Sequence, residues 1–309
     1  MQTELVEDNK FIVSGHETFS LRFGWLKKSY DFSRRMARDG GAIKNAFRES
    51  SAIATLGAGK NMCQSMEYWG KATQIIAHNT ESYLIPTPTE LGDRIFGDSG
   101  LDPYMEKAQT SALIHYLLAS NKRYVSWFYL FNETSHESFV ADDLIHGVIA
   151  KYQVSGVKIP SRATIHRDVQ TCINCYAKKP AKKKSAVEDI IDGPLVELGL
   201  IKRDGEEFFL QPLAVDLPPS MFAYLVFRYW KQTSGEASTL AVDALKYSAG
   251  SPGKVLRIDS EQFEELIDAL AETTGGALIS SEGGGVRQIQ RSGPWSDDTA
   301  NSWLDGAYV

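Results

Sequence analysis

The chain has 309 residues, 43% of them hydrophobic and 23% charged, as in a globular protein long enough for two or three domains. Its net charge of −6 excludes nucleic-acid binding by overall charge, so any such binding would need local basic patches. Three cysteines, a polar start and no apolar run of membrane-spanning length predict a cytoplasmic protein without a signal peptide or membrane partner.

A basic segment precedes the first predicted module. The short apolar run at 11–13 ends at Ser14-Gly15, before His16-Glu17-Thr18-Phe19. Residues 21–38 mix apolar and basic side chains, which predicts a mostly helical segment. Its basic residues could follow a phosphate backbone, although such a face is about as often simply solvated. Those we take as candidate DNA contacts are Arg22, Lys27, Lys28, Arg34 and Arg35.

Residues 55–76 predict the second half of a helix-turn-helix. A helix ending at Leu56 would break at 57–59 and resume near Lys60, with Met62, Met66 and Trp69 buried. In such motifs the start of the second helix contacts DNA. The alternative is an ordinary helical hairpin inside a core. The residues expected to face outward are Lys60, Asn61, Gln64, Ser65, Tyr68 and Lys71. Of these, the candidate DNA contacts are Lys60, Asn61, Gln64 and Lys71.

Two short apolar runs, at 74–76 and 83–86, flank a polar turn and predict a β-hairpin. A hairpin directly after a helix-turn-helix is the element order of a winged helix. This order is more specific than either part alone, so it favours a DNA-binding module over a core hairpin.

The same element order recurs twice. Ser161 caps a predicted helix that follows a helix at 139–152, and Asp204-Gly205 marks a hairpin. In the last third, a third hairpin is predicted at 277–290. It follows helices at 221–230 and 240–247, a strand at 255–258 and a helix capped by Asp259. We predict a mainly α fold with small β-hairpins (α+β), built of tandem winged-helix-like modules. The expected domains are 1–100, 101–215 and 216–309.

Two motifs that suggest chemistry have structural explanations. The run 57–60 (Gly-Ala-Gly-Lys) lacks the glycine and the serine or threonine that a phosphate-binding loop requires, so we expect no nucleotide there. Cys172 and Cys175 have the spacing of half a zinc site, but Cys63 is the only other cysteine, so we expect buried thiols and no structural zinc. His115 lies beside an apolar stripe and is expected to be a packing histidine.

His16 and Glu17 are the candidate catalytic pair. A His/Glu pair could bind a divalent metal or move a proton during phosphodiester cleavage. Adjacent residues in an extended strand point to opposite faces, so the two would act together only if a turn reorients them. The sequence contains no nuclease constellation of clustered carboxylates plus lysine, which favours a non-catalytic function without excluding an enzyme.

Several motifs resemble a bacterial family of uncharacterised function that includes SspB, the DNA-nicking component of the Ssp DNA phosphorothioation defence system. They are SGHETF (14–19), LRFGWLKK (21–28), LGAGKNM (56–62), YW (68–69), LDPY (101–104), PLVELGLI (194–201) and SPG (251–253). The similarity covers nearly the whole chain and preserves the order of the motifs.

The resemblance implies an anti-phage protein that acts on double-stranded DNA with a cysteine desulfurase, an ATP pyrophosphatase and an ATPase. It implies a single-strand nick that gives the sulfur-insertion enzymes access to DNA. We expect a nickase that depends on Mg²⁺ or Mn²⁺, with His16 and Glu17 as candidates because they lie in the most recognisable motif. The alternatives are a non-catalytic winged-helix adaptor or regulator that recruits the sulfur-transfer enzymes, and a protein-interaction scaffold.

Overall fold

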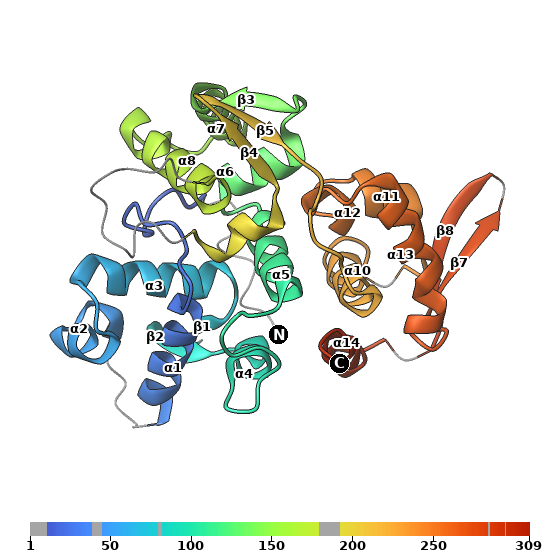
Figure 1. Ribbon diagram of the computed structural model, residues 1–309, viewed down its shortest axis with the longest axis horizontal. Helices are drawn as coiled ribbons and strands as arrows, with labels where there is room; N and C mark the ends of the chain where they lie inside the picture. Colours follow the sequence, from blue (N-terminus) through green and yellow to red (C-terminus); the bar gives the residue numbers. More distant parts are fainter. Residues whose placement is uncertain are drawn as a thin grey trace.

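The computed structural model describes residues 11–38, 45–79, 82–178, 192–235, 237–283, 285–293 and 295–309. It is mainly helical, with small antiparallel sheets, so the predicted α+β class is confirmed. Figure 1 shows α5 (Ala108–Ala119) near the middle of the molecule, with the N-terminal and C-terminal helices on either side of it.

The N-terminal unit has the predicted helix-turn-helix followed by a hairpin. Gly57 ends α2 in the left-handed conformation (φ 61°) that glycine adopts without strain, and α3 begins at Lys60. The hairpin pairs Ile76 with Pro88, and α1 packs against both α3 and β2. The elements are α1 (Trp25–Arg38), η1 (Ala46–Arg48), α2 (Ser50–Leu56), α3 (Lys60–Ala72), β1 (Ile76–Asn79), β2 (Ser82–Pro88) and α4 (Glu90–Phe96).

The middle unit contains two long helices between the first and second strands of a three-stranded sheet. Its strand order is β3-β5-β4, so the strand before the helices pairs with the last strand of the hairpin, as Phe139 does with Phe208. The elements after α5 are α6 (Val125–Phe128), the π-helical turn η2 (Tyr129–Glu133), β3 (Ser138–Val140), α7 (Ala141–Ser155), α8 (Arg162–Tyr176), η3 (Pro194–Leu198), β4 (Ile201–Asp204) and β5 (Glu207–Leu210).

The C-terminal unit repeats this connectivity. Its sheet has the order β6-β8-β7, and Leu240 pairs with Ile289. In Figure 1 the β7–β8 hairpin extends away from the helices of this unit. The elements are α10 (Pro219–Thr233), β6 (Thr239–Ala241), α11 (Val242–Tyr247), α12 (Pro252–Val255), α13 (Ser260–Thr273), β7 (Leu278–Gly283), β8 (Val286–Arg291) and α14 (Asp297–Gly306).

Three predicted elements differ from the structure. The helix expected at 139–152 begins only after the three-residue strand β3, and the helix at 240–247 begins only after β6. The strand expected at 255–258 is wrong. The side chain of Ser251 accepts a hydrogen bond from the amide of Lys254, and Pro252 occupies the first helical position, so a short helix, α12, forms at 252–255. Val255 is its last residue, and a turn follows at 256–257.

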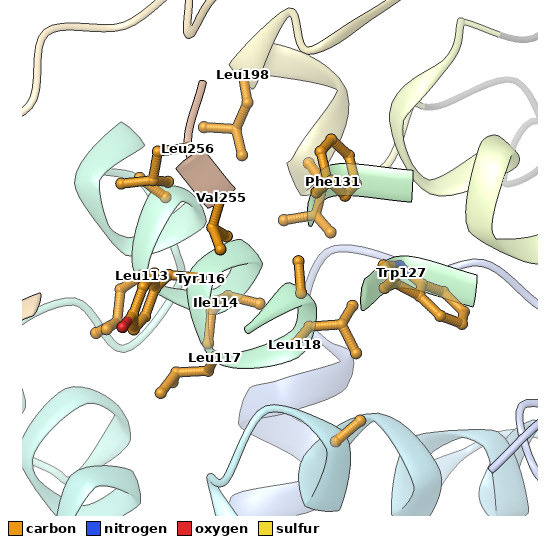
Figure 2. Packing of buried hydrophobic residues seen from close by; sticks show 14 of the residues in the cluster. Leu113, Ile114, Tyr116, Leu117, Leu118, Trp127, Phe131, Leu198, Val255 and Leu256 are labelled. Atoms are coloured by element: carbon orange, nitrogen blue, oxygen red, sulfur yellow. The ribbon is translucent and has the colours of Figure 1, made fainter. Parts of the chain in front are cut away.

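One continuous core joins the three units, and α5 lies at its centre. Residues 110–119 are all buried, and α5 contacts η3, α6, α10 and α12. Figure 2 shows Leu113, Ile114, Leu117 and Leu118 of α5 together with residues from other elements, Trp127, Phe131, Leu198, Val255 and Leu256. A helix that must pack on several sides is apolar around most of its circumference.

His115 is the polar group at this junction. One ring nitrogen, Nδ1, is 2.8 Å from the hydroxyl of Tyr176 on α8, and Nε2 is 2.9 Å from the carbonyl oxygen of Val255 on α12. Burial lowers the pKa of His115 to about 4, which keeps the ring neutral. The predicted packing role of this histidine is confirmed.

No helix in the described part of the chain combines the length and the apolar character that spanning a bilayer requires.

Candidate nucleic-acid interface

The predicted catalytic pair lies in a tight turn. Gly15, Glu17 and Thr18 all have positive φ values, of 112°, 48° and 64°, and the amide of Phe19 donates to the carbonyl of His16 at 2.8 Å. Residues other than glycine rarely adopt this conformation, so surrounding contacts must hold the turn. The turn places His16 in the interior, 3% exposed, while Glu17 stays half-buried.

Both ring nitrogens of His16 are engaged inside the protein. Nδ1 accepts the amide hydrogen of Thr18 at 3.0 Å, so Nε2 carries the proton and donates to Oδ1 of Asp168 at 3.1 Å. The other oxygen of Asp168, which is fully buried on α8, accepts from the hydroxyl of Ser126 at 2.5 Å. In this arrangement neither nitrogen is available to take a proton from a substrate.

A divalent cation does not fit the described residues around this turn. Both carboxylate oxygens of Asp168 already accept hydrogen bonds. Across the described part of the chain, no three or more His, Cys, Asp or Glu side chains are grouped so that they could hold a metal ion. We therefore derive no metal-dependent step from this geometry. Cys63, Cys172 and Cys175 are buried and form no disulfide, and the burial of Cys172 and Cys175 is as predicted. Burial raises the pKa of the Cys172 thiol.

The predicted recognition helix α3 is exposed only in its first turn. Lys60 and Asn61 are exposed and Gln64 is half-buried, but Ser65 and Tyr68 are buried. The turn at 14–19 covers this face: the hydroxyl of Ser65 donates to the carbonyl of His16 at 3.0 Å, and the Tyr68 ring meets the His16 ring edge-on at 5.4 Å. The expectation that Ser65 and Tyr68 face outward was wrong, because periodicity within a helix does not reveal a distant segment that covers it.

The predicted basic contacts are largely occupied by partners within the protein. Lys28 donates to the carbonyl of Leu56 at 3.0 Å, and Arg22 lies over the rings of Phe19 and Trp25. Arg35 is exposed. Burial lowers the pKa of Lys71, which is paired with an acid. The acid–base pairs are Lys27–Asp31 at 2.6 Å, Arg34–Asp98 at 2.8 Å and Lys71–Glu67 at 2.6 Å.

A different basic surface lies on α8. Ser161 caps this helix by accepting the amide hydrogen of Thr164 at 3.2 Å. Arg162 is held by Asp142 on α7 (2.9 Å) and lies 3.4 Å from Nε2 of His146. An open hollow of about 520 Å³ lies on this side of the helix, lined by Arg162, Ala163, His166 and Arg167.

Two further basic residues of this surface are His166 and Arg167. Both are exposed, and the structure gives neither side chain a hydrogen-bond or ion-pair partner among the described residues. The cap and the apolar face of α8 are predicted from the sequence, but its outward face is not among the predicted sites. The helical spacing of Arg162, His166 and Arg167 is the signal that could have identified it.

Comparison with known proteins gives a family and two related structures. The family model described as "Protein of unknown function (DUF4007)" matches residues 13–308. Two crystal structures of SspB are similar to this chain, one of them described as magnesium ion-bound. In both cases the TM-score is 0.82 and the identity is 27%, over 97% of this chain and 88% of the other. No curated protein gives a significant match.

Proposed function

This chain belongs to the DUF4007 family of proteins of unknown function, and we propose that it is the DNA-binding component of a bacterial phosphorothioation-type defence system. The observation that carries the proposal is the similarity to SspB, which extends over 97% of the chain at a TM-score of 0.82. In this role it would act with a cysteine desulfurase, an ATP pyrophosphatase and an ATPase.

The element order supports DNA binding by winged-helix-like units, with domains 1–100, 101–215 and 216–309. In the middle and C-terminal units, helices lie between a first strand and a hairpin, and that first strand pairs with the last strand of the hairpin. A winged helix has this connectivity. The N-terminal unit has the helices and the hairpin, and its described sheet has two strands.

Binding to a 30-base-pair duplex, measured by fluorescence anisotropy over a series of salt concentrations, tests this function. We expect log Kd to rise linearly with log salt, because each neutralised phosphate releases counterions and contributes about 0.9 to the slope. A protein of net charge −6 that binds through a local patch should give a small slope. Absence of binding at about 50 mM salt would contradict the proposal.

A metal-dependent nickase is the second candidate, favoured by the magnesium ion-bound structure of the related SspB. Purified protein incubated with supercoiled plasmid and Mg²⁺ or Mn²⁺ should then form open-circular product, and EDTA should prevent this. A non-catalytic adaptor would bind DNA and leave the plasmid supercoiled.

Glu17 is the informative variant for the nickase hypothesis. Its half-buried side chain has no hydrogen-bond or ion-pair partner among the described residues, so Glu17→Gln should leave the fold unchanged. If Glu17 takes part in the reaction, this variant should lose nicking and keep DNA binding. Nicking at the wild-type rate would remove Glu17 from the candidate catalytic residues.

A further inference from the structure

We propose that the protein contacts duplex DNA through the outward face of α8 in the middle unit, with Arg167 and His166 at its centre. This proposal rests on the proposed DNA-binding function and deepens it by assigning the surface. It assigns DNA contact to α8 instead of α3, the helix that the sequence favours. It also excludes α13, the equivalent helix of the C-terminal unit, as a DNA-contacting helix.

The three helices that precede the hairpins can be compared position by position from their N-caps. The caps are Gly59 for α3, Ser161 for α8 and Asp259 for α13. Positions two, five, six, nine and thirteen after the cap form one stripe along a helix. In α8 this stripe is Ala163, His166, Arg167, Gln170 and Asn174, all exposed or half-buried and none of them acidic.

The same stripe in α13 is entirely acidic, and every residue in it is exposed. It consists of Glu261, Glu264, Glu265, Asp268 and Glu272. Arg287 on β8 donates to Glu264 and Asp268, so the nearby cation is already neutralised. Five carboxylates in a row would repel a phosphate backbone. The position of Arg167 in α8 corresponds to Glu265 in α13.

In α3 the same stripe is covered. Asn61 is exposed and Gln64 is half-buried, but the following positions, Ser65, Tyr68 and Ala72, are buried. The turn that contains His16 occupies the space that a DNA groove would need. Of the three helices, α8 therefore has a stripe that is neither acidic nor buried.

The side chains of the α8 stripe are suited to DNA. Arginine and histidine donate hydrogen bonds to phosphates and to guanine, and the amides of Gln170 and Asn174 can both donate and accept at base edges. Arg162 is paired with Asp142, which lowers the net charge at the start of the helix but fixes the position of the Arg162 side chain. The open hollow lined by Ala163, His166 and Arg167 lies on this same face.

The buried side of α8 is held by polar contacts that α13 does not have. The position of Asp168 in α8 is occupied by Leu266 in α13, and both are buried. His16 and Ser126 donate to the two oxygens of Asp168, so two distant segments fix α8 from behind. Such contacts resist rotation of the helix about its axis and keep Arg167 turned outward.

Charge reversal at Arg167 tests the proposal with the full chain and the same 30-base-pair duplex. Arg167→Glu should weaken binding about tenfold or more, and Arg167→Ala should weaken it less and lower the salt slope by about one. Lys122→Glu is the control, because Lys122 is also exposed and has no partner among the described residues. Lys60→Glu tests the rival helix α3. Thermal melting should be unchanged in all variants.

The outcomes distinguish a failure of the assignment to α8 from a failure of the proposed DNA-binding function. If the wild type does not bind the duplex, the proposed function fails. If the wild type binds and Arg167→Glu binds equally well, or if Lys60→Glu weakens binding more, the assignment to α8 is overturned while DNA binding stands. An equal loss from Lys122→Glu also overturns it, since the effect would then be one of overall charge.

Discussion

At the residue scale, Asp168 is the buried carboxyl group through which the N-terminal turn, α6 and α8 meet. A buried carboxyl group requires hydrogen-bond donors, since leaving it without them costs several kcal/mol. It receives one from His16, 152 residues earlier in the chain, and one from Ser126. The geometry therefore favours a positioning role for His16, and a catalytic role for this residue stays a proposal to be tested.

Replacing His16 by alanine should destabilise the protein by about 3 kcal/mol, because Asp168 would lose a donor and the imidazole would leave a cavity. Urea unfolding followed by circular dichroism measures this. His136→Ala is the matched control, since His136 is exposed and should change the free energy of unfolding by less than about 0.5 kcal/mol. Equal midpoints for the two variants would contradict the buried network.

At the element scale, the N-terminus of α4 is hydrogen-bonded to the segment that follows α3. The hydroxyl of Thr89 accepts the amide hydrogen of Gly92 at 2.9 Å and donates to the carbonyl of Gln74 at 2.6 Å. A Cβ atom on Gly92 would lie 2.2 Å from the carbonyl oxygen of Ile75, so the helix can approach this closely only with glycine there.

Gly92→Ala should lower the free energy of unfolding by about 2 kcal/mol, since the clash is with backbone and α4 must shift. The sign of this change in the free energy of unfolding is informative, because alanine in a helix otherwise stabilises a protein by about 1 kcal/mol relative to glycine. Gly283→Ala serves as the control, because a Cβ atom on Gly283 would meet no other atom within 4 Å. A Gly92→Ala variant as stable as the wild type would show that the two segments can separate without cost.

Elements with local signals could be predicted from the sequence. The caps Ser161 and Asp259 start helices as expected, and the Asp204-Gly205 turn joins β4 and β5. The three-residue strands β3 and β6 could not be predicted, because each exists only through pairing with a hairpin strand that follows much later. The candidate site was harder to predict from the sequence than these strands. Whether an outward face is open depends on what covers it, and for α3 the cover is the turn around His16.

At the scale of the whole molecule, contacts between distant segments hold the units together. Nη1 of Arg94 on α4 donates to both carboxylate oxygens of Asp305 on α14, at 2.7 and 2.8 Å. The hydroxyl of Thr110 on α5 lies 2.9 Å from that of Tyr308, near the end of the chain. His115 makes the third such connection, between α5, α8 and α12.

The depressed pKa of His115 predicts a loss of stability in mild acid. The ordinary pKa is 6.5 and that in the folded state is about 4, so between these values the unfolded chain binds a proton that the folded protein excludes. Stability is therefore full above pH 6.5 and falls as the pH drops toward 4, by about 3 kcal/mol in total.

Urea midpoints measured between pH 4 and 7.5, for the wild type and for His115→Gln, check this. Glutamine cannot titrate, so the variant should be less stable at pH 7.5 but should show a shallower decline in acid. The same decline in both proteins would assign the acid sensitivity to other groups.

The hydrogen bond between His16 and Asp168 also has a consequence for biosynthesis. A nascent chain leaves the ribosome from its N-terminus, so the segment with His16 is synthesised well before α8. When Asp168 emerges, its donor is already outside the tunnel, and the carboxyl group can be buried at once. A fragment that begins at residue 101 would lack this donor. Expression of residues 101–215 alone should then give a product that is retained by chaperones or degraded. This is expected although the fragment contains all three strands of the β3-β5-β4 sheet and the helices α7 and α8.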